Sequence, residues 1–275
     1  MQQRTAGSKG NGHRRAIATA GSKSSLTGEA SGKASQKQRK VSQQVAHHAN
    51  TPLPSLPPTV LPGELTSPAA IDALHRAFNA ATPFRHLHVR NVFPDVLLEA
   101  ARDELLRATY FRKRNDLYDF AQTDDLRLVA DGTAIAAVRD SIYSKQFRAW
   151  ITAITGIETL PKVDASAALY DVGGHLLCHD DDLAARRIAY IVYLVPRQWD
   201  VRVDGGSLDL FNTTPDGRAP HRIVRRLEPV WNSLAFFDVS HVAHHQVRKR
   251  RRYWLLSNRS FVCVWHASCV FLCPA

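Results

Sequence analysis

The run of short apolar segments that begins at Val163 restricts the fold more than any other feature of this sequence. Segments of strand length follow one another at 165–170, 188–195, 207–211, 223–227, 234–239 and 253–256. Turns rich in glycine separate them, among them Asp171-Val-Gly-Gly and Asp204-Gly-Gly. No helical pattern lies between consecutive strands, which argues against alternating βαβ units and favours a β-sandwich or a jelly-roll barrel.

Three helical patterns precede this run of strands. Ser67 and Pro68 supply an N-cap and a first-turn proline for the first helix. A second helix follows Pro94, and a third begins near Thr133 and continues through Ile151. The predicted fold is therefore mostly β with N-terminal helices: a double-stranded β-helix, or jelly-roll barrel, preceded by supporting helices.

Residues 1–62 differ in composition from the remainder of the chain. They hold nine Lys or Arg and a single acid, Glu29, so they carry about eight of the formal net charge of +11. Polar residues dominate without apolar periodicity, and prolines stiffen the end of the segment. We expect a disordered basic tail and Pro-rich linker at 1–62 and a folded domain at 63–256. Nucleic-acid contact, a nuclear or organelle signal and a plain solvated leader all fit such a tail.

The apolar runs and the cysteines bear on location. No run reaches the roughly 20 apolar residues that a membrane span needs. The cysteines Cys178, Cys263, Cys269 and Cys273 have neither the spacing of a zinc site nor that of a disulfide framework, which fits a reducing compartment. We expect no membrane association and a location in the cytoplasm, the nucleus or both, while the oligomeric state is not predicted.

A His-x-Asp pair lies in the segment Leu176-Leu-Cys-His-Asp-Asp-Asp-Leu183, directly after a glycine turn. Side chains two apart in an extended segment point the same way, so His179 and Asp181 are expected to project together. Two imidazoles and one carboxylate leave open positions on a six-coordinate iron(II), as a co-substrate and oxygen require. By itself the pair is weak evidence, because a loop histidine beside solvated acids is equally compatible with the pattern.

The second imidazole of such a site must come from a distant strand. His241, His244 and His245 follow the predicted strand 234–239, and His245 is the favoured ligand. A zinc hydrolase is a poorer fit because no second acid lies at a suitable spacing, and neither a Gly-rich phosphate loop nor a serine elbow is present.

Several ordered motifs resemble the eukaryotic prolyl hydroxylases that act on the decoding-centre protein of the small ribosomal subunit, a branch of the 2-oxoglutarate oxygenases. They are the His-x-Asp segment, Arg186-Arg-Ile-Ala-Tyr-Ile-Val-Tyr-Leu-Val-Pro196, Gly205-Gly-Ser-Leu-Asp-Leu210, Pro229-Val-Trp-Asn232, Phe236-Phe-Asp-Val-Ser240 and His245-Gln-Val247. The resemblance extends from about residue 70 to Val247.

The resemblance implies a function and a set of roles. His179, Asp181 and His245 would be the catalytic iron ligands, and Tyr170 and Tyr193 would contact 2-oxoglutarate. The implied reaction uses Fe(II), 2-oxoglutarate and O2, with ascorbate to keep the iron reduced. It would hydroxylate a prolyl residue of a ribosomal small-subunit protein and release succinate and CO2.

The end of the chain departs from the family. The family clamps 2-oxoglutarate with an arginine on the strand after the distal histidine, and its planar fork suits a carboxylate. Arg252 is the candidate and Arg259 the alternative, although the family's arginine lies farther from the histidine than Arg252 does. Residues 257–275 are expected to form an atypical C-terminal tail, with the family's second barrel domain absent.

Two other functions remain open from the sequence. The altered C-terminus is compatible with a catalytically disabled member of the fold that acts as a binding or regulatory protein. The basic tail is compatible with an oxygenase that acts on nucleic acid.

Overall fold

The computed structural model describes residues 61–160, 163–182 and 186–251, together with the backbone of 261–270. The helices are α2 (Gly63–Thr66), α3 (Pro68–Ala80), α4 (Asp95–Leu105), α5 (Ala134–Tyr143), α6 (Lys145–Thr155) and α7 (Val201–Asp204). The strands are β1 (His86–Arg90), β2 (Phe111–Arg114), β3 (Tyr118–Gln122), β4 (Val163–Asp164), β5 (Ala167–Tyr170), β6 (His175–His179), β7 (Arg186–Leu194), β8 (Leu208–Thr213), β9 (Pro220–Leu227), β10 (Ser233–Asp238), β11 (His245–Val247) and β12 (Phe261–Val270). Residues 1–60 of the predicted tail and the predicted strand at 253–256 lie outside the described residues.

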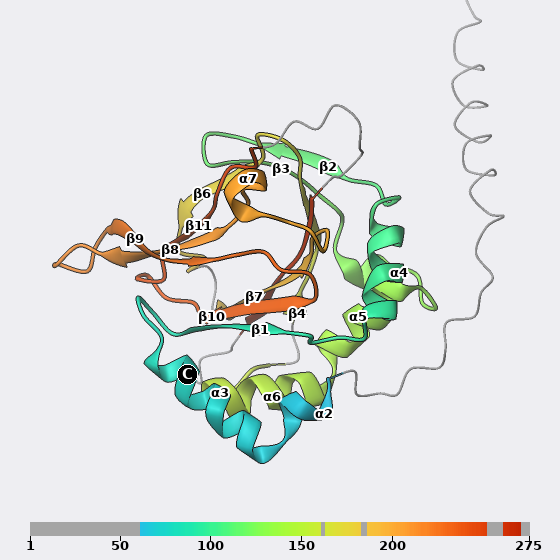
Figure 1. The fold of residues 1–275 in the computed structure, drawn as a ribbon, viewed down its shortest axis with the longest axis horizontal. Helices are drawn as coiled ribbons and strands as arrows, with labels where there is room; N and C mark the ends of the chain where they lie inside the picture. Colours follow the sequence, from blue (N-terminus) through green and yellow to red (C-terminus); the bar gives the residue numbers. More distant parts are fainter. Residues whose placement is uncertain (1–60, 161–162, 183–185, 252–260, 271–275) are drawn as a thin grey trace, which may run out of the picture. The chain divides into compact units, whose positions relative to one another are not determined.

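The strands form one antiparallel sheet that folds back on itself (Figure 1). Its path runs β1-β10-β7-β12-β5-β3-β6-β11-β8-β9. Strand β3 joins the two halves, because its end at Ala121–Gln122 pairs with β5 and its start at Tyr118–Asp119 pairs with β6, while β2 pairs along its other edge. Side chains from both halves share one buried cluster, for example Tyr193 and Phe237 from the first half and Leu176 and Leu210 from the second. The two halves therefore face each other, and the double-stranded β-helix predicted from the sequence is confirmed.

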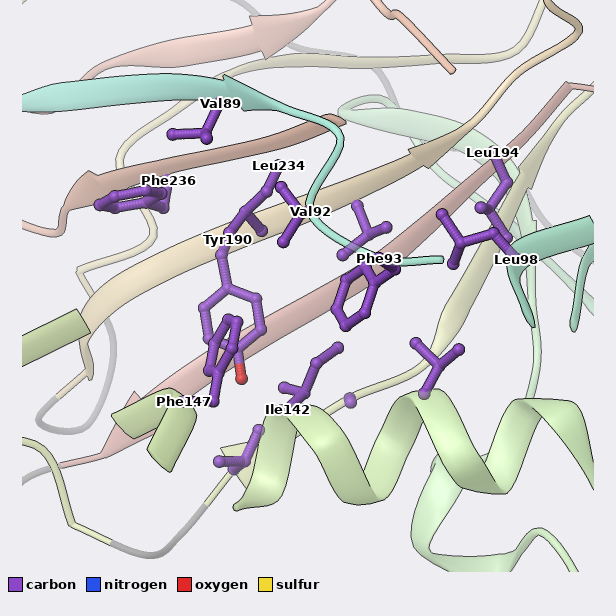
Figure 2. Close-up of a cluster of buried hydrophobic side chains, with 14 of the residues drawn as sticks. Val89, Val92, Phe93, Leu98, Ile142, Phe147, Tyr190, Leu194, Leu234 and Phe236 are labelled. Atoms are coloured by element: carbon purple, nitrogen blue, oxygen red, sulfur yellow. The ribbon is translucent and has the colours of Figure 1, made fainter. Parts of the chain in front are cut away.

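Strand β7 shows how the core is divided. Tyr190 and Leu194 belong to an outer cluster, which the helices cover, whereas Ile191 and Tyr193 belong to an inner cluster inside the barrel. A strand buried on both faces has an almost continuous apolar sequence, as β7 does. Figure 2 shows the outer cluster, where Tyr190 reaches toward Phe147.

The predicted third helix is two helices in the structure. Ser144 ends α5 with an extended backbone, and its hydroxyl accepts a hydrogen bond from the N–H of Phe147 to begin α6. This is an N-cap, for which serine is well suited. The apolar spacing continues across the break because both helices cover the same face of the sheet, so periodicity alone did not reveal it.

Asn232 ties the start of β10 to the start of α4. Its carboxamide oxygen accepts from the N–H of Phe93 at 3.0 Å, and its amide nitrogen donates to the Phe93 carbonyl at 2.7 Å and to Asp95 at 2.9 Å. Its backbone adopts the left-handed conformation, with φ of 54°, and the residue is 2% exposed. These three hydrogen bonds attach the start of α4 to the sheet. None of the helices in the described parts of the chain has the length and apolar character of a membrane span.

Candidate metal centre

His179 ends β6 and reaches the barrel interior through an irregularity in strand pairing. In β6, Leu176 pairs with Val247 of β11 and His179 pairs with His245, so three steps along β6 match two along β11. An extra residue of this kind is a β-bulge, which turns the following side chain to the other face. Leu176 lies in the inner cluster, and without the bulge simple alternation would direct His179 outward. The bulge therefore places His179 opposite His245.

Asp181 lies beyond the end of β6 and has a left-handed backbone, with φ of 57°. Aspartate is among the few residues with a side chain that tolerate this conformation. In a fully extended segment, His179 and Asp181 would be aligned by alternation. The structure brings them together through the left-handed backbone of Asp181 instead: the Nε2 atom of His179 lies 3.4 Å from a carboxylate oxygen of Asp181.

His245 supplies the third side chain. It begins β11, is 1% exposed, and its Nε2 atom lies 3.4 Å from the second carboxylate oxygen of Asp181. Its ring packs on Phe237 of β10, with ring centroids 4.5 Å apart. Of the three candidate histidines, His241 is exposed, and His244 is buried but lies outside the cluster of metal-ligand type that His245 completes.

The three side chains can hold one metal ion. Candidate ligand atoms of His179, Asp181 and His245 all lie within 4.8 Å of one another. Each imidazole is held by its Nδ1 atom, which donates to a backbone carbonyl: Leu177 at 2.8 Å for His179 and Ala243 at 2.9 Å for His245. A carbonyl only accepts, so in the neutral rings Nδ1 carries the proton and Nε2 carries the lone pair.

This arrangement of two imidazoles and one carboxylate favours a bound cation. Two Nε2 lone pairs beside a carboxylate repel one another unless a proton or a metal ion lies between them. The pKa of His179 shows the same preference for positive charge. Burial lowers this pKa, but the hydrogen bond to Asp181 and the charge of Asp181 outweigh burial and raise it above the ordinary 6.5. Two imidazoles and one carboxylate on one side of an ion form the donor set of non-haem iron(II) sites, with the remaining positions open.

The residues expected to bind 2-oxoglutarate are only partly described. Tyr170 ends β5 and Tyr193 lies near the end of β7, and both are buried in the inner cluster. Tyr170 stacks on Phe120 with ring centroids 5.2 Å apart, and the ring of His88 meets Tyr193 edge-on at 5.8 Å. The candidate clamps Arg252 and Arg259 lie outside the described residues.

Two residues beside the centre were not identified from the sequence. Arg186 begins β7 and places a guanidinium nitrogen 3.8 Å from Asp181. Phe237 forms one wall against His245. The alternation of β10 could have identified Phe237 as inward-facing, but nothing local in the sequence distinguishes Arg186 from its neighbour Arg187.

Comparisons with known proteins agree with this geometry. Residues 165–266 match the model described as the 2OG-Fe(II) oxygenase superfamily. Over 166 residues the chain is 45% identical to prolyl 3-hydroxylase OGFOD1 of Mus musculus, which is 60% of this chain and 30% of that protein. The chain thus spans less than a third of this curated relative.

Two solved structures share the fold. A prolyl-4-hydroxylase of Pseudomonas putida has a TM-score of 0.54 at 19% identity, over 72% of this chain and 98% of that one. A prolyl hydroxylase of Trichoplax adhaerens, in complex with a peptide fragment of hypoxia inducible factor, has a TM-score of 0.55 at 12% identity, over 75% and 95%. At these identities the likeness concerns the jelly-roll fold alone.

Proposed function

We propose that this chain, whose residues 165–266 match the 2OG-Fe(II) oxygenase superfamily model, is an iron(II)- and 2-oxoglutarate-dependent dioxygenase that hydroxylates a prolyl residue of a protein. The observation that carries the proposal is the convergence of His179, Asp181 and His245 inside a double-stranded β-helix. The name of the mouse relative, a prolyl 3-hydroxylase, supports the prolyl substrate.

The proposed iron ligands are His179, Asp181 and His245. Bound by these three side chains, iron(II) would supply the chemistry that couples oxidation of 2-oxoglutarate by O2 to succinate and CO2 with hydroxylation of the substrate. The chain's own residues orient the side chains that would bind the metal. The carbonyls of Leu177 and Ala243 hold both rings in one tautomer and orientation, which is the usual second layer of support around a metal.

The barrel wall protects the centre from water. Phe237 is fully buried against His245, and Phe84 packs edge-on against Phe237 with ring centroids 5.8 Å apart. Apolar walls lower the local dielectric and limit side reactions of the bound co-substrates. We further assign 2-oxoglutarate contacts to Tyr170 and Tyr193 and its distal carboxylate to Arg252, with Arg259 as the alternative.

The proposal also covers the substrate, the reductant and the location. Following the resemblance of the motifs, we propose a small-subunit ribosomal protein as the substrate, ascorbate as the reductant that maintains iron(II), and a cytoplasmic or nuclear location. The basic tail at 1–62 supplies a possible nucleic-acid contact through its Lys and Arg side chains. If the substrate were itself nucleic acid, removing residues 1–62 would strongly reduce turnover, whereas a prolyl protein substrate should tolerate the removal.

The test is a spectroscopic titration without oxygen. Adding iron(II) and 2-oxoglutarate to the full chain should produce a visible charge-transfer band, and His179→Ala should abolish it. His241→Ala is the matched control, because His241 lies four residues before His245 but is exposed. Mass spectrometry of a ribosomal peptide after aerobic incubation should show one added oxygen atom. Absence of the band in the unmodified chain would refute the proposal.

A second candidate function follows from β12. This strand lies between β5 and β7, after the distal histidine, yet Phe261–Val270 contains neither arginine nor lysine. The carboxylate clamp must then come from residues before β12, or the chain is a disabled oxygenase that acts as a binding or regulatory protein. The disabled protein would bind iron(II) but show no saturable response to 2-oxoglutarate.

A further inference from the structure

A cavity of about 470 Å³ opens beside the candidate metal centre. The β2–β3 hairpin, the end of β4 and the start of β7 contribute its lining, which includes Phe111, Lys113, Asp124, Asp125, Asp164 and Arg186. Arg186 connects the two places, because it lines the cavity and also lies 3.8 Å from the carboxylate of Asp181. A group held in the cavity is therefore a neighbour of the metal centre.

Carboxylates outnumber free cations in this cavity. Asp125 and Asp164 share one guanidinium, that of Arg127, at 2.6 and 3.3 Å. Arg186 faces Asp181, which leaves Lys113 as the remaining cation of the lining. Within the described part of the chain, Asp124 has no ion-pair partner, and its side chain is exposed. With Asp181 counted, four carboxylates face the three cations Lys113, Arg127 and Arg186, so the cavity has a small excess of negative charge in a chain whose formal net charge is +11.

An exposed aromatic ring completes the lining. Phe111 pairs with Gln122 across the β2–β3 hairpin and leaves 51% of its surface exposed at the cavity. An aromatic face beside a carboxylate is the combination that receives a lysine or arginine side chain, since the ring binds the cation and its aliphatic stem while the acid neutralises the charge. A glutamate or aspartate side chain would instead meet Asp124 and its neighbours.

We propose that this cavity is a substrate subsite that binds a lysine or arginine side chain flanking the target proline. Phe111 and Asp124 would contact the cationic side chain, and Arg186 separates it from the metal centre. The inference rests on the proposed function, because it assigns the cavity to the peptide that the oxygenase modifies. It adds a requirement that the fold does not dictate: the sequence around the proline must be basic.

Peptide binding without turnover tests the subsite. Two fluorescent peptides with one proline each would differ only in the flanking residues, which are lysine in one and glutamate in the other. Fluorescence anisotropy with the full chain, iron(II) and 2-oxoglutarate in the absence of oxygen should show that the lysine peptide binds roughly tenfold more tightly, as expected for a partly shielded charge pair. Asp124→Lys should remove this preference or reverse it, and Phe111→Ala should weaken the lysine peptide selectively.

Asp103→Lys is the matched control, because it makes the same charge change at an exposed position of α4 outside the cavity, and it should leave the preference intact. Equal binding of the two peptides to the unmodified chain, or an unchanged preference in Asp124→Lys, would overturn the subsite. The charge-transfer band measured on the same samples reports on the proposed function separately. A band without peptide preference refutes only the subsite, whereas a preference without the band refutes the oxygenase and retains the cavity as a peptide site.

Discussion

Replacing Asn232 by alanine should lower the free energy of unfolding by about 3–5 kcal/mol. Asn232 is 2% exposed, and its side chain makes three hydrogen bonds, two to the backbone of Phe93 and one to the side chain of Asp95. Alanine would remove all three bonds. It would also leave the N–H of Phe93, a residue that is 3% exposed, without the side-chain acceptor it now has.

The magnitude follows from these contacts. Loss of the two bonds to Phe93, one of which leaves a buried N–H without its acceptor, costs about 2–3 kcal/mol together. The bond to Asp95 contributes less, because that carboxylate has a half-exposed side chain and water can replace the amide. The left-handed backbone, with φ of 54°, adds about 1 kcal/mol for alanine, which tolerates it less well than asparagine.

Urea unfolding followed by circular dichroism measures the change. Asn232→Gly loses the same hydrogen bonds but accepts the left-handed backbone, so it should be less destabilised than Asn232→Ala by about 1 kcal/mol. Asn212→Ala is the control: Asn212 accepts one bond from the N–H of Arg222 at a half-exposed position and should cost under about 1 kcal/mol. A cost below about 1 kcal/mol for Asn232→Ala, or a glycine variant less stable than the alanine variant, would refute the reasoning.

Three further predictions concern acid stability, co-substrate binding and the core. Burial lowers the pKa of His88 from 6.5 to about 4, so between these pH values the unfolded chain binds a proton that the folded chain does not. Stability should therefore fall as pH drops from about 6.5 to about 4, by about 3 kcal/mol, and His88→Gln should flatten this slope in urea titrations at stepwise pH. Arg252→Ala should raise the 2-oxoglutarate concentration at half-saturation at least roughly tenfold, measured by the charge-transfer band, while an effect of Arg259→Ala alone would identify the other arginine as the clamp. Leu98→Ala, at a fully buried position of α4, should lower the unfolding free energy by about 2–5 kcal/mol in denaturant titrations, and a loss under about 1 kcal/mol would show that the outer cluster is loosely packed.

The fold was predictable because its core strands are separated by glycine turns and carry buried side chains. Strands β7 and β10 fell within one or two residues of their predicted bounds, since each has a continuous apolar stretch, Ile188–Leu194 in β7 and Leu234–Phe237 in β10. The β2–β3 hairpin was missed for the opposite reason. Strand β2 is exposed at every residue and reads Phe-Arg-Lys-Arg, so no apolar alternation marks it. Its pairing with β3 is set by the tertiary structure.

The grouping of His179, Asp181 and His245 was predictable from the sequence, but its geometry was not. A His-x-Asp pair and a later histidine can be found by inspection, yet the bulge that turns His179 inward depends on the pairing of β6 with β11. The left-handed backbone of Asp181 is likewise invisible to a rule based on alternation. Arg186 approaches Asp181 only because β7 starts at the same end of the barrel at which β6 stops.

The central position of β12 has a consequence for how the chain acquires its structure. Phe261–Val270 is synthesised after all of its partners, yet it pairs with β5 and β7 on either side. Until it emerges from the ribosome, both neighbours present unpaired backbone N–H and C=O groups within the sheet, and such edges recruit other chains. The nascent chain is therefore prone to aggregation until β12 is available, and a chaperone that binds at that stage would protect it.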